Sequence, residues 1–153
     1  MRLYHTGCIA VDEFNPHRFQ GLESTFYASV LADSLLKPLF GDGKPEHVDH
    51  LTAFTAESFG GPDRFSRELG FCHLIAVHRG LHIEEEQRAR FVELYMAALD
   101  KAAMPRDEAF RKAVREHVEF GSHVAMQNSN AATDAELHPL RSVPKWTWPG
   151  DRS

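Results

Sequence analysis

The sequence of 153 residues lacks any apolar stretch close to the roughly 20 residues that a membrane-spanning helix needs. Its first residues, Met1 to Asp12, include an early acid and lack the long apolar core of a signal peptide. Cysteine is scarce, with only Cys8 and Cys72, which is typical of the reducing cytosol rather than of a disulfide scaffold. These absences predict a soluble cytoplasmic protein with no membrane partner.

A basic segment is also missing. The chain has 17 Lys and Arg against 22 Asp and Glu, for a net charge of −5, so nucleic acid is a poor candidate for a partner. Strand signals are weak throughout, and no internal repeat is visible. What the sequence does contain is a hydrophobic fraction of 42%, enough for one domain, together with ten His and eleven Phe.

Apolar residues recur at helical spacing in several segments that Pro and Gly separate. The clearest is Phe91–Leu99, where apolar residues follow at i, i+3, i+4, i+7 and i+8. Before Leu22, Pro16 and Gly21 are expected to limit any helix. From Asn128 onward the chain is polar and then rich in Pro and Trp, so we expect a tail outside the main fold. The pattern predicts an all-α protein.

His78 closes a short apolar run that begins at Leu74, and Gly80 follows almost at once. If this run is helical, Leu74 and His78 share one face, because residues four apart stack on a helix. An imidazole on an inward-looking face is placed to bind a metal, for which it is the commonest protein ligand. A core histidine with a satisfied hydrogen bond is the other interpretation.

The order of particular residues separates this chain from a plain helix bundle. An aromatic-Gly-Gly-Pro motif ends the second helical stripe, and its distance to His78 is specific. In this order the chain resembles the truncated haemoglobins, which are two-on-two helical globins, and most of all their group II. The resemblance covers roughly Leu22 to Asn128 and rests on Phe26-Tyr27, Phe40, His47, Leu51, Phe54, Phe59-Gly60-Gly61-Pro62, His78 and Phe91.

The resemblance implies a truncated two-on-two globin domain over residues 21–128. An N-terminal extension, 1–20, would precede it, and an irregular C-terminal tail, 129–153, would follow. It also implies a haem cofactor. Haem b, bound without covalent attachment, is expected because the sequence has no Cys-x-x-Cys-His motif.

The family roles carry over to individual positions. His78 aligns with the histidine that binds the haem iron, Tyr27 with the distal tyrosine, and Phe40 with an aromatic that packs on the haem face. The remaining aligned pocket positions are His47, Leu51 and Phe91. Helical spacing also places His47, Leu51 and Phe54 on one stripe, and His50, one position away, is expected to reach a haem propionate.

Several positions depart from the group II pattern. Phe91 stands where the group usually has a tryptophan that donates a hydrogen bond to the ligand, so polar control is expected to rest on Tyr27 and His47. Val77 replaces an arginine, and Phe59 replaces the usual tryptophan of the Gly-Gly-Pro motif. His47 occupies a position that is often small.

The resemblance implies oxygen binding or transport, with dioxygen, nitric oxide, carbon monoxide or peroxide as ligands. It extends to nitric oxide dioxygenase or peroxidase-type activity with a reductase partner, in a monomer or homodimer, and no separate catalytic residue is assigned. Two alternatives stay open. One is a non-haem metal hydrolase using His47, His50 and His78, although zinc normally takes three or four ligands. The other is a haem-free, globin-like sensor.

Overall fold

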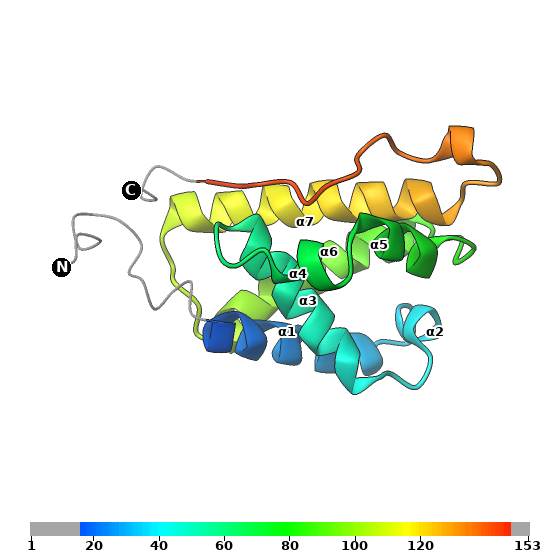
Figure 1. Cartoon of the computed structure of the whole chain (residues 1–153). Coiled ribbons are helices and arrows are strands. Elements are labelled where there is room, and N and C mark those ends of the chain that lie inside the picture. The colour runs from blue at the N-terminus through cyan, green and yellow to red at the C-terminus, as the bar shows by residue number, and fades with distance from the viewer. Residues whose placement is uncertain (1–15, 148–153) are drawn as a thin grey trace.

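The computed structural model describes residues 16–147. Within that range the regular elements are all α- or 3-10 helices, and there is no strand. The elements are α1 (Pro16–Leu31), α2 (Lys37–Phe40), α3 (Pro45–Ser58), α4 (Arg64–Glu68), α5 (Phe71–His78), α6 (Glu85–Lys101), α7 (Glu108–Ser129) and the 3-10 helix η3 (Asp134–Glu136). This confirms the predicted all-α class, and Figure 1 shows the long helix α7 lying across the other helices.

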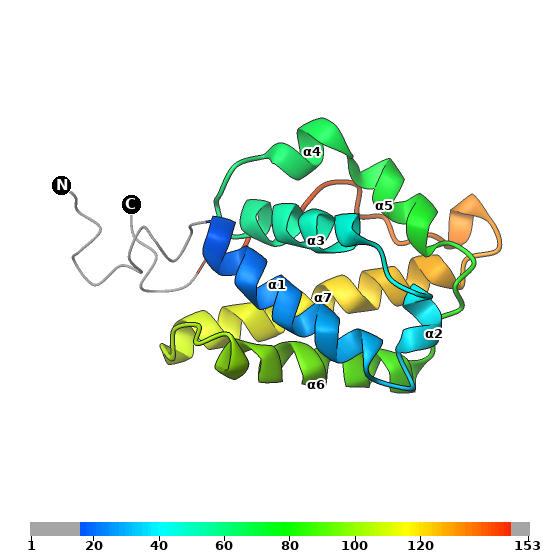
Figure 2. The ribbon, with the colours of Figure 1, turned by 90° about the horizontal axis from the view of Figure 1, so that it is seen from below.

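Two helix pairs form the body of the fold. Helix α1 packs on α3, α6 packs on α7, and the pairs meet where α1 contacts α6 (Figure 2). The short helices α4 and α5 pack on α3 and α7 respectively. This is the predicted two-on-two arrangement. Within the described part of the chain, no helix is both long enough and apolar enough to cross a membrane.

The core lies between these pairs. Phe26 is fully buried, and its ring meets those of Phe91 and Tyr95 edge-on, with centroids 4.8 and 4.9 Å apart. Apolar residues from α1, α6 and α7 complete one continuous cluster. The helix faces that were recognised by their spacing in the sequence are therefore the ones that bury large side chains.

The loop after His78 is tied to the end of α7. The backbone N–H groups of Gly80 and His82 both donate to the Ser129 carbonyl, at 3.1 and 3.2 Å. The N–H of Ile83 donates to the Ser129 hydroxyl at 2.9 Å. These bonds fix the C-terminal end of α5, and with it the position of His78.

The Gly-Gly-Pro motif has a local structural cause. Gly60 has a φ of +92°, a conformation that other residues rarely adopt. A Cβ atom on Gly61 would lie 2.8 Å from the Ala56 carbonyl oxygen. Because that carbonyl accepts the Gly61 N–H at 2.8 Å, the close approach of the two backbones ends α3.

The expectation that Pro16 and Gly21 limit any helix was wrong. Helix α1 begins at Pro16 and continues through Gly21. Proline suits the first turn of a helix, where no intrahelical partner for its N–H is needed. An exposed glycine costs a helix only about 1 kcal/mol, and the burial of Phe19 and Leu22 on either side outweighs that cost.

The segment after α7 does not lie outside the main fold as predicted. Figure 1 shows it running back along α7. Val143 is buried and Trp146 packs against the main core. The backbone N–H of Trp146 donates to the Ser58 carbonyl at 2.8 Å. Isolated apolar residues in a Pro-rich segment have no periodicity that reveals such packing. Trp148 lies beyond the described residues.

Candidate functional site

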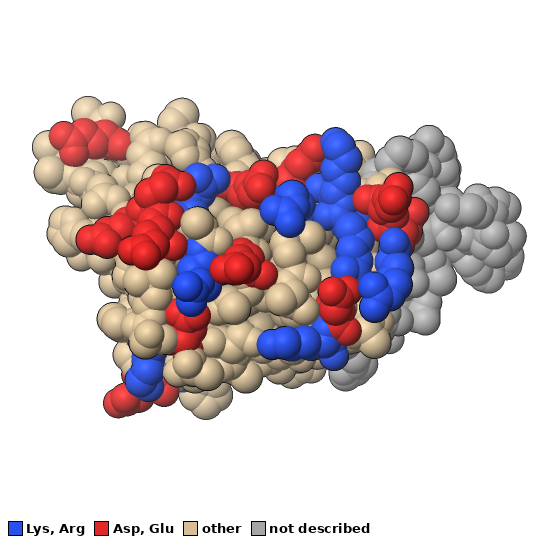
Figure 3. Space-filling view, turned by 180° about the vertical axis from the view of Figure 1, so that it is seen from behind, with Lys and Arg blue, Asp and Glu red and all other residues tan. Residues whose placement is uncertain are grey.

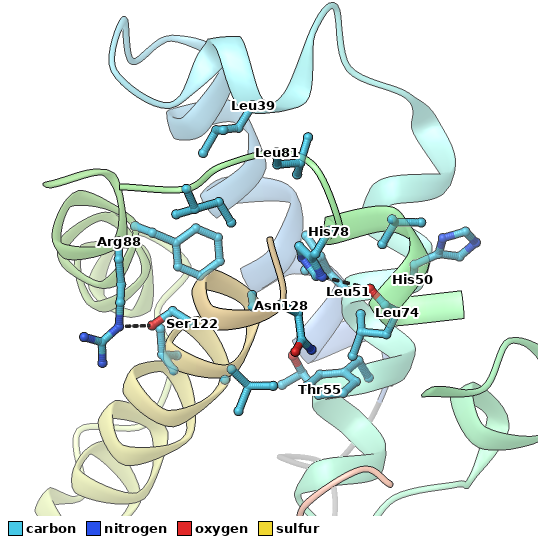
Figure 4. A pocket seen from close by; sticks show the side chains of 18 of the residues that line it. Leu39, His50, Leu51, Thr55, Leu74, His78, Leu81, Arg88, Ser122 and Asn128 are labelled. Atoms are coloured by element: carbon cyan, nitrogen blue, oxygen red, sulfur yellow. Dashed lines mark hydrogen bonds between the residues drawn. The ribbon is translucent and has the colours of Figure 1, made fainter. Parts of the chain in front are cut away.

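A cavity of about 290 Å³ opens between α3, α5, α6 and α7 (Figure 4). Its walls are largely apolar, and its volume is near the lower end of the roughly 300–1,000 Å³ of small-molecule sites. The structure brings nearly all predicted site residues to this one cavity. They are Phe40, His47, His50, Leu51, Phe54, His78 and Phe91; Tyr27 is the exception.

His78 is held in one orientation at the end of α5. Its Nδ1–H donates to the Leu74 carbonyl one turn earlier, at 2.9 Å, as Figure 4 shows. Burial lowers the pKa of His78, which keeps the ring neutral. With its proton on Nδ1, the ring has a free electron pair on Nε2. A backbone carbonyl that orients an imidazole in this way is the usual support of a metal-binding histidine.

Tyr27 lies behind His47 rather than on the cavity wall. Its hydroxyl accepts the Lys44 N–H at 3.1 Å and lies 2.5 Å from Nδ1 of His47. Among the described residues, this nitrogen is the acceptor within reach of the tyrosine proton, so Tyr27 donates to it. Burial, followed by the charge of Lys44, lowers the pKa of His47. The neutral His47 ring therefore has its proton on Nε2 and is a hydrogen-bond donor.

Aromatic rings line the cavity near His47. Phe40 packs edge-on against Tyr27 and His47, with ring centroids 5.7 and 6.2 Å apart. Phe54 packs edge-on against Phe65 at 5.2 Å. These contacts hold the rings in place, so the cavity has firm apolar walls with few polar groups.

His50 has a neighbour that the sequence did not reveal. Its ring lies 5.8 Å from that of His73 on α5, and both side chains line the cavity. His73 by itself carries no spacing signal that links it to His50. Only the folded chain brings these two rings together.

The three-histidine metal site is not formed. Within residues 16–147, no group of three or more His, Cys, Asp or Glu side chains is arranged to hold a metal ion. His47 is engaged with Tyr27 and His50 faces His73, so neither ring is grouped with His78. The alternative of a hydrolase with a His47–His50–His78 metal site was therefore wrong, since the three rings have different neighbours.

A buried carboxyl group adjoins the cavity and was missed in the sequence. Glu23 is 0% exposed, and its Oε2 accepts hydrogen bonds from Thr55 Oγ1 at 2.7 Å and from the Tyr95 hydroxyl at 2.6 Å. Burial raises the pKa of Glu23 to about 7, while these two bonds act in the opposite direction. The sequence did contain one indication that Glu23 is buried, because it lies three residues before Phe26 on the inward-facing stripe of α1.

His117 is a second buried polar group, on α7. Its ring packs against Phe54 and Phe59, with centroids 5.9 and 5.2 Å away, and it lines the cavity. Its Nδ1 is buried without a hydrogen-bond partner among residues 16–147, and burial lowers the pKa of His117 to about 4. The ring is therefore neutral near pH 7, as expected for a core histidine.

Known proteins share this architecture. Residues 15–128 match the bacterial-like globin family. A haemoglobin of the thermophilic phototrophic bacterium Chloroflexus aurantiacus is 26% identical, with a TM-score of 0.65 over 75% of this chain and 94% of that chain. A thermostable haemoglobin of the actinobacterium Thermobifida fusca is 25% identical, with a TM-score of 0.63 over 72% and 89% of the two chains.

The fold is also that of a group II truncated haemoglobin of Bacillus anthracis, which is 23% identical. The TM-score is 0.66 over 78% of this chain and 90% of that chain. No curated relative matches the chain.

Proposed function

This chain belongs to the bacterial-like globin family, and from that premise we propose that His78 is the protein ligand of a non-covalent b-type haem held in the cavity. Haem and the binding of diatomic ligands come with the family. The assignment to His78 is supported by one observation above all. Its Nδ1–H is bound to the Leu74 carbonyl, so Nε2 is left as an electron-pair donor beside a cavity with apolar walls.

The surrounding residues fit such a cofactor. A haem is a large apolar disc, and Phe40, Leu51, Phe54 and Phe91 offer it rigid apolar contacts. His50 and His73 are the candidates for its carboxylates. Bound haem would supply an iron that takes up a diatomic molecule, and His78 would hold that iron.

We assign the donor for that molecule to His47. Its Nε2–H is available to the cavity because Tyr27 occupies Nδ1. A hydrogen bond to a charged acceptor contributes roughly 1.5–3 kcal/mol, which retains a ligand about ten- to hundredfold longer. Tyr27 then acts as a positioning residue that fixes the protonated nitrogen of His47.

The proposed activities are nitric oxide dioxygenation and peroxidase-type turnover. The first combines dioxygen with nitric oxide to give nitrate and leaves the iron ferric, so a reductase partner must return one electron. It is supported by the neutral His47 donor, which favours retention of dioxygen. A cytoplasmic location, where reductases are at hand, is part of this proposal and is supported by the scarcity of cysteine.

An absorption spectrum of the purified protein tests the binding function. We expect one intense band at the violet edge of the visible range, which shifts when carbon monoxide is added to the reduced protein. Nitrate formed from nitric oxide by the dioxygen-loaded protein tests the dioxygenase activity, and oxidation of a phenolic dye by hydrogen peroxide tests the peroxidase activity. A protein that shows no such band even after addition of haem would contradict the proposal.

A further inference from the structure

The two carboxyl oxygens of Glu23 differ in their hydrogen bonding. Oε2 accepts both available hydrogen bonds, whereas Oε1 is buried without any partner among the described residues. A buried carboxylate with one bare oxygen is costly, because no donor among the described residues compensates the charge on that oxygen. The neutral acid is therefore favoured, and the burial that raises the pKa of Glu23 to about 7 has the same effect.

Two hydroxyl groups connect this carboxyl group to the cavity. Thr55 comes from α3 and Tyr95 from α6, and both line the cavity while they donate to Glu23. Burial and the neighbouring carboxyl raise the pKa of Tyr95 well above its ordinary value, so its hydroxyl relays a proton and does not lose one.

We propose that Glu23 exchanges protons with oxygen chemistry in the cavity, through the hydroxyl groups of Tyr95 and Thr55. This inference rests on the proposed haem function. One hydroxyl, which donates to Oε2 in this structure, turns its O–H bond toward the cavity and gives that proton to the superoxide formed there, while its oxygen accepts the acid proton of Glu23. Water that enters the cavity then returns a proton to Glu23 by the reverse path.

The reaction that reveals the exchange is oxidation of the dioxygen-loaded, reduced protein. Dioxygen, one electron from the reduced haem and one proton combine to a hydroperoxyl radical, and the protein is left in its ferric form. Because Glu23 supplies the proton, oxidation should quicken as the pH falls through about 7. The groups that face Glu23 are Tyr95 and Thr55; α2 also contacts α1, but its one charged residue, Lys37, is exposed.

The test follows this oxidation between pH 5 and pH 9 by absorption. We expect Glu23→Gln to remove the inflection near pH 7 and to slow oxidation at pH 6 by about tenfold, a modest effect for a positioned proton donor. The double variant Tyr95→Phe, Thr55→Val keeps the carboxyl group and breaks the relay, so it should lose the same inflection. It also decides the question if Glu23→Gln does not fold.

Glu57→Gln is the matched control. Glu57 is the second buried glutamate of the described residues, at 3% exposed. Its oxygens accept hydrogen bonds from Ser66 and pair with Lys145, and it does not line the cavity. This variant should keep the wild-type pH profile.

Infrared spectroscopy of the resting wild-type protein provides a second readout that needs no turnover. The carbonyl stretch of a neutral carboxylic acid should be present at pH 6, lost at pH 8.5 and absent from Glu23→Gln. A pH profile of Glu23→Gln that superimposes on that of the wild type, or the absence of this band at pH 6, would overturn the inference. If the same samples contain haem and bind dioxygen, only the role of Glu23 fails; without haem, the proposed function fails with it.

Discussion

His47 and Tyr27 share one hydrogen bond, so the two residues are unequal candidates for contact with a ligand. His47 lines the cavity and has a free Nε2–H, whereas the Tyr27 hydroxyl is used by His47 and by the Lys44 backbone. The resemblance implied both as pocket residues. The resemblance could not show which of the two side chains faces the cavity, because that depends on how closely α1 approaches α3.

Replacement of His47 by Leu should speed dioxygen release by about ten- to hundredfold, because a hydrogen bond to a partly charged acceptor is lost. Tyr27→Phe should have a smaller effect. It leaves the imidazole of His47 in place and only removes the hydrogen bond that keeps the His47 proton on Nε2. Flash photolysis or stopped-flow mixing measures both rates. An effect of Tyr27→Phe as large as that of His47→Leu would mean that the tyrosine itself donates to the ligand.

Glu23 and His117 should affect stability in opposite directions as the pH changes. Folding raises the pKa of Glu23 from 4.5 to about 7, so the folded state holds a proton that the unfolded state lacks between these values. Stability from this group is complete below pH 4.5 and is lost as the pH rises to about 7. Folding lowers the pKa of His117 from 6.5 to about 4, so its contribution is lost as the pH falls through that window.

Urea unfolding at pH 5 and pH 8 checks these signs. Between pH 5 and pH 8 the wild type should lose about 2–3 kcal/mol of unfolding free energy that Glu23→Gln does not lose. His117→Phe should gain relative stability at pH 5 instead. Parallel pH profiles for all three proteins would contradict the assignment of the two buried groups.

At the scale of elements, periodic apolar spacing predicted the main helices because each has one buried face. The start of α1 and the course of the tail were not predictable in this way. The first depends on burial around Gly21, and the second on single contacts made by Val143 and Trp146. Glu23 was passed over for a similar reason, since a charge on an apolar stripe is recognised only when its partners are known.

The end of α3 should be sensitive to a single methyl group. Gly61→Ala places a Cβ 2.8 Å from the Ala56 carbonyl oxygen, and we expect it to cost about 1–3 kcal/mol. Gly21→Ala is the matched control, because its Cβ would meet no described atom outside its own stretch of helix within 4 Å, and alanine favours a helix by about 1 kcal/mol. Thermal unfolding of both variants provides the comparison. Equal stability of the two would show that the close approach at Gly61 is not a constraint.

The tail should contribute to stability through Trp146. Its indole packs against the core near His117, with ring centroids 6.2 Å apart. Trp146→Ala should lower the unfolding free energy by about 2 kcal/mol, less than the roughly 3–5 kcal/mol for a fully buried tryptophan. Thr147→Ala, at the exposed next residue, serves as the control in the same denaturant titration. A Trp146→Ala protein as stable as this control would show that the tail does not contribute to the stability of the fold.

At the scale of the whole molecule, charge contributes little to the architecture. On the face drawn in Figure 3, basic and acidic side chains are interspersed. Pairs such as Arg64–Asp49 and Lys112–Glu116 are largely exposed, and pairs of this kind contribute at most about 1 kcal/mol. The fold depends instead on apolar packing between the helix pairs. Apolar spacing in the sequence therefore predicted the helices, while their two-on-two arrangement was predicted from the family resemblance.

The central claim is that His78 binds the iron of a haem in the cavity, and substitution with chemical rescue tests it most directly. His78→Gly removes the imidazole and leaves space for a free one. The absorption spectrum of this variant should lose the wild-type iron–histidine form, and added imidazole should restore it. His82→Gly is the matched control, because His82 is exposed, does not line the cavity and has a φ of +53° that suits glycine; this variant should keep the wild-type spectrum throughout. A His78→Gly protein with unchanged haem content and spectrum, indifferent to imidazole, would contradict the claim.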